Sequence, residues 1–141
     1  MVRCVRRLFA ALFLLGTPAT LVAQSSVSDG EYLALGRKLY DWFMSAEADS
    51  LLAYVNAGVR ENAGGNDGVQ RMVADFLDRS GVEQELLVEK MTLRRGSPQY
   101  WRESRYTSYT DEPIVFRWVF DNEGKIIGIG TGPKSSTPEP D

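Results

Sequence analysis

The spacing of hydrophobic residues changes near residue 81, and this change constrains the fold class. Before it, apolar side chains recur at the three- and four-residue spacing of an amphipathic helix: Tyr32, Leu35, Leu39, Trp42 and Phe43. After it, apolar and polar residues alternate as in a half-buried strand, most clearly at Ile114, Phe116, Trp118 and Phe120. Helices followed by an antiparallel meander predict an α+β domain, with the helices packed on one face of a curved sheet.

The helical part divides into three predicted segments. A helix over 29–44 begins with a capping box formed by Ser28 and Glu31. A second begins after Ser45 and ends near Gly58, and a third runs from Asp67 to a helix stop at residues 80–81. The alternating part predicts about four strands, separated by turns at 94–98, 110–113 and 121–124.

Residues 1–23 have the layout of a secretory signal peptide. Three arginines precede the apolar run Leu8–Leu15, and small residues lead to Ala23. The run is shorter than the roughly 20 residues that span a bilayer, which disfavours the alternative of an uncleaved membrane anchor. We therefore expect cleavage after Ala23 and export to the bacterial periplasm or medium. The remaining chain divides into a flexible start (24–28), one domain (29–132) and a disordered tail (133–141).

The charge balance excludes two classes of partner. The chain has 16 basic and 19 acidic residues, and three of the basic residues lie in the leader, so the exported domain carries a net charge of −6. Binding to nucleic acid or to an anionic membrane requires clustered basic residues. We therefore expect neither partner after the leader is removed.

The chain lacks the residues that most catalytic and metal sites use. It contains no histidine, and its single cysteine, Cys4, lies in the leader. The exported domain can therefore form no disulfide, no Ser-His or Cys-His nucleophile pair and no histidine-based metal site. We predict neither a cofactor nor a metal ion.

Two stretches together are typical of one family. The first is Leu39–Met44 followed by Glu47–Leu51, a helix that runs through a short acidic turn into a second helix. The second is Pro113–Asp121 followed by Gly124–Gly128, a final hairpin. Over about 29–133 the chain resembles the nuclear transport factor 2-like (SnoaL-like) superfamily. The resemblance implies a cone-shaped, cystatin-like domain with a pocket between the sheet and the first helices, and often a dimer. The superfamily includes isomerases, dehydratases and binding modules, so it fixes no activity.

The aromatic residues suggest a ligand pocket, with ordinary core packing as the alternative. Apolar walls of such a pocket would come from Tyr40, Trp42, Phe116 and Trp118. The strand over 99–109 adds a second group whose direction depends on the register. In one register Trp101, Glu103 and Arg105 face inward with Trp118. In the other they are solvent-facing, and the inward residues are Tyr100, Arg102, Ser104 and Tyr106.

These residues lead to three hypotheses about function. The first is non-catalytic binding of a small apolar or amphipathic ligand, or of a protein partner. The second is an isomerase- or dehydratase-like enzyme in which burial raises the pKa of Asp41 or Glu103, so that the carboxylate acts beside a tyrosine. The third is a structural homodimer that packs through the sheet face bearing Val115, Arg117 and Val119.

Overall fold

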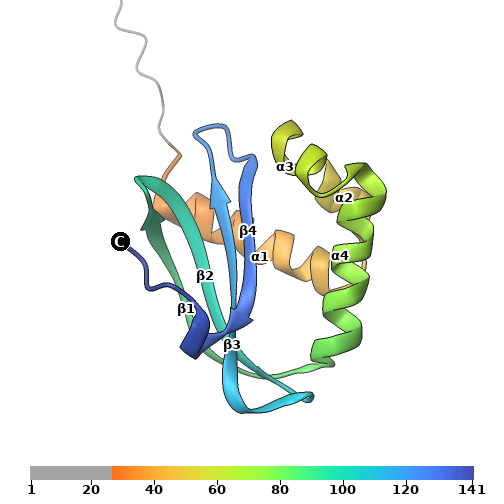
Figure 1. Ribbon diagram of the computed structural model, residues 1–141. Helices are drawn as coiled ribbons and strands as arrows, with labels where there is room; N and C mark the ends of the chain where they lie inside the picture. Colours follow the sequence, from red (N-terminus) through yellow and green to blue (C-terminus); the bar gives the residue numbers. More distant parts are fainter. Residues whose placement is uncertain (1–26) are drawn as a thin grey trace, which may run out of the picture.

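The computed structural model describes residues 27–141 as an α+β arrangement with four helices and an open, four-stranded antiparallel sheet (Figure 1). The predicted leader, its cleavage site and residues 24–26 lie outside the described residues. Within residues 27–141, no helix has the length and hydrophobicity needed to cross a membrane. The elements, in chain order, are α1 (Asp29–Met44), α2 (Ala48–Leu52), α3 (Ala57–Asn62), α4 (Gly65–Ser80), β1 (Glu83–Arg94), β2 (Ser97–Tyr106), β3 (Tyr109–Phe120), β4 (Ile126–Pro133) and the 3-10 helix η1 (Lys134–Ser136).

The first helix confirms the prediction for residues 29–44. The Ser28 hydroxyl accepts a hydrogen bond from the Glu31 amide, and the Glu31 carboxylate accepts one from the Ser28 amide at 2.8 Å. The predicted second helix is wrong, because the chain forms two short helices there. Ala46 adopts a left-handed conformation (φ 57°), and Asn56 caps α3 by accepting from the Gly58 amide at 2.7 Å. Gly58 therefore begins a helix instead of ending one.

The sheet is a meander in the order β1-β2-β3-β4. Arg95 and Gly96 join β1 to β2, both with positive φ as a tight two-residue hairpin requires. The predicted turn at 110–113 is wrong, because β2 and β3 already reverse at residues 107–108. Residues 110–113 instead form a wide bulge in β3, opposite Arg105 alone. Pro113 is tolerated in a central strand because it lies in this bulge, outside the regular ladder.

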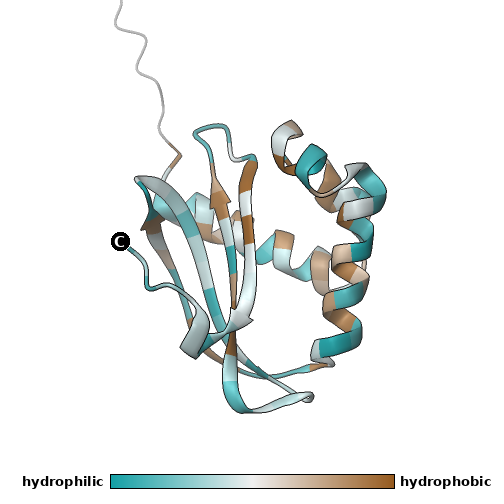
Figure 2. Cartoon of the chain, viewed as in Figure 1, coloured by the Kyte–Doolittle hydropathy of each residue, from teal (hydrophilic) through white to brown (hydrophobic). Residues whose placement is uncertain are grey.

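The two faces of the sheet are covered differently, and we call the face against α1 the inner face and the opposite one the outer face. Figure 1 shows α1 crossing behind the sheet, with α2, α3 and α4 gathered beyond β4. The inner face carries Tyr100 opposite Trp118 and Arg102 opposite Phe116. In α1, Gly36 allows the helix to approach β2, because a Cβ there would lie 2.3 Å from the Tyr100 ring. Figure 2 shows hydrophobic and hydrophilic residues alternating along α4, as expected of a helix buried on one side.

The C-terminal segment lies on the outer face, where the sequence predicts a disordered tail. The Ser135 amide donates to Glu112 at 3.1 Å, and the Asp141 amide donates to the Leu93 carbonyl at 3.3 Å. The Lys134 ammonium lies 4.7 Å from the centre of the Trp101 ring. These contacts hold a polar, proline-containing segment to the sheet without a hydrophobic core of its own.

Candidate functional site

Half of the predicted pocket residues come together, but they fill the space they were expected to line. Tyr40, Phe116 and Trp118 are buried between α1 and the inner face. The Phe116 ring centre lies 5.2 Å from that of Tyr40 and 4.6 Å from that of Trp118. Phe43 packs against the same two sheet residues. Trp42 lies apart from this group and packs against Tyr54. The alternative of ordinary core packing therefore describes these residues.

The remaining predicted pocket residues lie on the outer face, which corrects their assignment to the interior. Trp101 is opposite Arg117, and the Trp101 indole donates to the Glu103 carboxylate at 2.7 Å. Arg105 is exposed and lies 3.8 Å from Glu85. The bulge in β3 sets this register, since it places Ser104 opposite Ile114 and turns Trp101 and its face-mates away from Trp118.

The inner face instead carries a polar network that we call the tyrosine–arginine cluster. Arg102 lies at its centre and donates to both oxygens of Glu83 at 2.9 and 3.0 Å and to Glu89 at 2.9 Å. The Arg102 guanidinium also stacks on the Tyr40 ring, 4.2 Å from its centre. The members of the cluster are Tyr40, Glu83, Glu89, Tyr100, Arg102 and Tyr106.

The tyrosines complete the network. The Tyr40 hydroxyl donates to the Glu83 carboxylate at 2.9 Å, and its oxygen accepts from the Tyr106 hydroxyl at 2.5 Å. The Tyr100 hydroxyl donates to Glu89 at 2.7 Å. From α1, Arg37 donates to the same carboxylate, also at 2.7 Å. Each carboxylate therefore has a cation and a hydroxyl as partners.

The electrostatics keep this cluster in one protonation state near neutral pH. Burial raises the pKa of Glu83, but hydrogen bonds and the charge of Arg102 outweigh it, so the pKa lies below its ordinary value. The pKa of Glu89 is lowered in the same way, with Arg37 and Tyr100 opposing burial. Burial raises the pKa of Tyr106 to about 12. A general acid or base needs a pKa near the working pH, and these groups are shifted away from it.

The two predicted catalytic carboxylates lie on different elements, Asp41 on α1 and Glu103 on the outer face of β2. Asp41 is exposed, at the rim of a cleft formed by α1, the end of α4 and the start of β1. For Glu103, burial raises the pKa, but hydrogen bonds from Trp101 and Lys134 outweigh it and lower the pKa. The acid–base hypothesis required the opposite shift.

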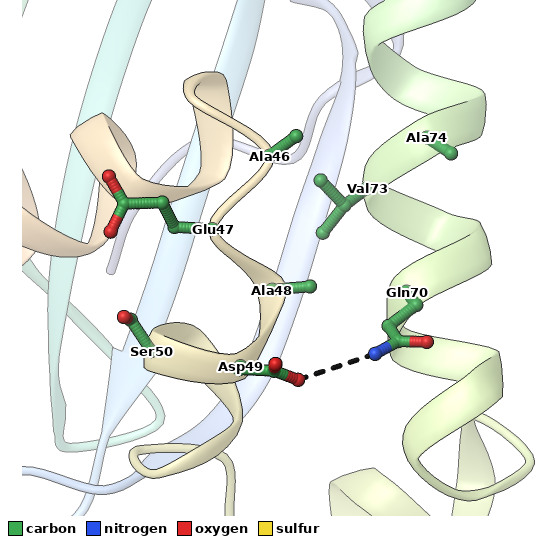
Figure 3. Close-up of a pocket in the computed structure, with 8 residues that line it drawn as sticks. All are labelled: Ala46, Glu47, Ala48, Asp49, Ser50, Gln70, Val73 and Ala74. Carbon is green, nitrogen blue, oxygen red and sulfur yellow. Dashed lines mark hydrogen bonds between the residues drawn. The ribbon is translucent and has the colours of Figure 1, made fainter.

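Two hollows of the described chain are open grooves. The cleft beside Asp41 has a volume of about 670 Å³, and Arg102 and Glu83 form part of its wall. A second groove of about 470 Å³ lies between α4 and the α2 region (Figure 3). Its walls carry mostly short side chains, and the Gln70 amide reaches Asp49 at 3.4 Å (Figure 3). The hollows between α4 and β4 are smaller, about 220 and 90 Å³.

Exposed hydrophobic side chains concentrate along β1, a feature that the sequence analysis missed. We define the β1 edge by its exposed apolar residues, which are Val82, Leu86, Leu87 and Leu93. The other large exposed apolar residues of the described chain are Tyr109 and Ile127. Within the described residues, β2 alone pairs with β1 as a strand. The other side of this 12-residue strand has no strand partner, and the Asp141 amide reaches it at the Leu93 carbonyl. Two register shifts expose Leu86 and Leu87 in succession and interrupt the alternation that sequence patterns rely on.

Comparisons with known proteins add no assignment to this geometry. Residues 27–141 contain no group of three or more acidic side chains placed to hold a metal ion. No protein-family model, curated protein or solved structure matches the chain.

Proposed function

We propose that this protein is an exported, non-catalytic binding domain that takes an extended segment of a protein partner along the β1 edge. The observation that carries the proposal is the coincidence of an open strand edge with four exposed apolar side chains. An unpaired edge offers main-chain donors and acceptors to a further strand. Exposed apolar side chains beside it add the hydrophobic contact that a partner strand needs.

The interior supports a protein partner over a small ligand. Ligand pockets for small molecules enclose about 300–1,000 Å³. The hollows between α4 and β4, which touch Phe76, are smaller than this, at about 220 and 90 Å³. The cleft beside Asp41 is larger and touches the core at Tyr40. The larger grooves are open, and the cleft beside Asp41 has charged wall residues that already bind one another.

We also propose that the chain belongs to the nuclear transport factor 2-like superfamily and that residues 1–23 direct its export. Support for the family comes from the element order, since the helices precede a meander whose inner face packs on α1. Support for export comes from the charged start, short apolar run and small residues of the stretch 1–23. Catalysis is not part of the proposal, because the acidic and tyrosine groups of the cluster have pKa values shifted away from neutrality.

The test is a selection of displayed random peptides against the full chain, followed by NMR mapping of the winners. We expect the selected peptides to be extended and apolar, and to shift the amide resonances of residues 82–93. Leu87→Lys should weaken binding at least about tenfold, because lysine would place a charge in an apolar contact. Burying an apolar side chain of this size contributes about 1–3 kcal/mol.

The matched control is Ile127→Lys, because Ile127 and Leu87 are almost equally exposed, at 39% and 37%. This control should bind the peptides as the wild type does. Selected peptides that map to another surface, or that bind Leu87→Lys undiminished, would contradict the proposal. If the chain forms a concentration-dependent dimer through the β1 edge, the partner of this edge is a second copy of the chain and the proposal of a foreign partner is wrong.

A further inference from the structure

A group of cations surrounds Trp101 on the outer face of the sheet. Lys90, Trp101, Arg117 and Gly130 pair in one row across the four strands. The Lys90 ammonium lies 5.9 Å and the Arg117 guanidinium 6.0 Å from the centre of the Trp101 ring. Lys134 approaches the same ring from the C-terminal segment. Three positive charges therefore meet at a single indole.

Of these three cations, only Lys134 forms an ion pair within the described chain, and Glu103 also faces the charge of Lys90. Glu103 and Glu139 both bind Lys134, at 3.0 and 2.9 Å. Within the described chain, Lys90, Arg94 and Arg117 form no ion pair within 4.0 Å. This patch lies on a domain whose overall charge is negative, so its positive charges are not a general surface property.

Arg117 is the most unusual member of the patch. Its Nε is buried and has no hydrogen-bond partner in the part of the chain that the structure describes. Burial, together with the nearby charge of Arg94, lowers the pKa of Arg117. Its guanidinium lies over Gly130, where a Cβ would come within 2.5 Å of Nη2. A buried donor without an acceptor destabilises the fold, and such groups are rare unless a ligand or ion completes them.

We propose that this patch is a binding site for a phosphate dianion, with Arg117 as the principal ligand and Arg94 and Lys90 as supporting cations. Arginine presents parallel N–H groups that match two phosphate oxygens. Arg117, Arg94 and Lys90 together carry three positive charges. A ligand with two negative charges neutralises them better than a ligand with one, such as a carboxylate. The site shares strand β1 with the β1 edge, through Lys90 and Arg94, but it uses the charges of the outer face in place of the exposed apolar side chains.

The experiment is a titration of the ¹⁵N-labelled full chain with sodium phosphate at pH 7.5, with ionic strength held constant by sodium chloride. The signal is the Nε–Hε resonance of each arginine. We expect the Arg117 resonance to shift along a saturable curve, and the same titration with sodium acetate to give no saturation. Arg117→Gln should abolish the saturable response of the neighbouring backbone amides, and Arg94→Gln should weaken the apparent affinity at least about threefold.

Arg105→Gln is the matched control, because Arg105 lies on the same face but already pairs with Glu85. This variant should bind phosphate as the wild type does. Linear, non-saturating shifts shared by all arginines would overturn the proposal. So would an unchanged response in Arg117→Gln, or equal saturation by acetate. The amide spectrum of Arg117→Gln shows whether the variant is folded, so loss of binding is separable from loss of structure.

Discussion

The two faces of the sheet use the same residue types with opposite results. On the inner face, Arg102 stacks on Tyr40 and donates to two carboxylates. On the outer face, Arg117 lies near Trp101 and, within residues 27–141, has neither an ion pair nor a partner for its buried Nε. Arginine beside an aromatic ring is therefore not informative by itself. The number of acceptors that the fold supplies distinguishes a structural arginine from one available to a ligand.

The coverings of the two faces explain this difference. A 16-residue helix covers the inner face and brings Tyr40 and Arg37 to the tyrosine–arginine cluster. The outer face has only η1 and the residues after it, whose acidic groups reach Lys134 but form no ion pair with Arg117. We expect substitutions on the inner face to change stability, and substitutions at Arg117 to change ligand binding.

The largest expected effect tests the inner side of this comparison. Arg102→Met removes the cation that Glu83 and Glu89 share, while the two carboxylates stay largely buried. Breaking a buried ion pair by removing one partner costs about 3–5 kcal/mol, because an uncompensated charge remains. We expect urea denaturation to show a loss of this size in the free energy of unfolding.

Arg105→Met is the control from the outer side of the same strand. The Arg105 side chain is 55% exposed and lies 3.8 Å from an equally exposed Glu85. Exposed pairs contribute about 0–1 kcal/mol, so this variant should unfold almost as the wild type does. Equal losses for the two variants would refute the distinction between the faces.

The elements predicted best from the sequence are those with local signals. The Ser28 capping box and helical spacing predict α1, and the alternation at 114–120 predicts the buried side of β3. The split between α2 and α3 was missed, because it depends on the left-handed Ala46 and on a cap from Asn56. Neither a left-handed residue nor a helix cap changes the spacing of hydrophobic residues, so this spacing does not reveal the split. The tail was also missed, since its attachment to the sheet uses single polar contacts in place of an apolar segment.

The candidate sites were predictable only as alternatives. The two registers of β2 were both visible in the sequence, and a non-local feature, the bulge opposite Arg105, selects between them. Glu83 and Glu89 were not identified as partners of Arg102, because two register shifts in β1 bring Glu83 two positions closer to Arg102 along β2 than a regular ladder would. The unpaired state of Arg117 depends on where every nearby acid points, which no sequence spacing encodes.

A pair of glycine substitutions tests whether the faces also differ in rigidity. At Gly36 a new methyl group would meet the buried Tyr100 ring, and at Gly130 it would meet the flexible end of Arg117. We expect Gly36→Ala to cost about 1–3 kcal/mol by overpacking, despite the better helix propensity of alanine. Gly130→Ala should change stability by less than about 0.5 kcal/mol, because Arg117 can move aside. Thermal unfolding of both variants measures this, and a larger loss at Gly130 would contradict it.

The smallest expected effect is a pH dependence of the unfolding free energy that is specific to the tyrosine–arginine cluster. Arg102 helps to hold the pKa of Glu83 and Glu89 below the ordinary 4.5 although burial acts to raise it. A folded-state pKa below the unfolded one contributes stability above pH 4.5, and that stability is lost as the pH falls through the folded pKa. In Arg102→Met the cation that opposes burial is gone, so burial raises the pKa of Glu83. Acidification then protonates this buried carboxylate, which removes its unfavourable charge and stabilises the folded variant.

The difference in unfolding free energy between wild type and Arg102→Met should therefore narrow as the pH falls from 7 to 4. Urea denaturation at several pH values, followed by tryptophan fluorescence, measures this difference directly. Carboxylates outside the cluster titrate in both proteins and cancel in the subtraction. The Arg105→Met difference should stay flat over the same range, because both partners of the Arg105–Glu85 pair are exposed and water screens their charges. A difference for Arg102→Met that is independent of pH would mean that Arg102 stabilises the fold by packing on Tyr40, and that its charge on the two carboxylates contributes little.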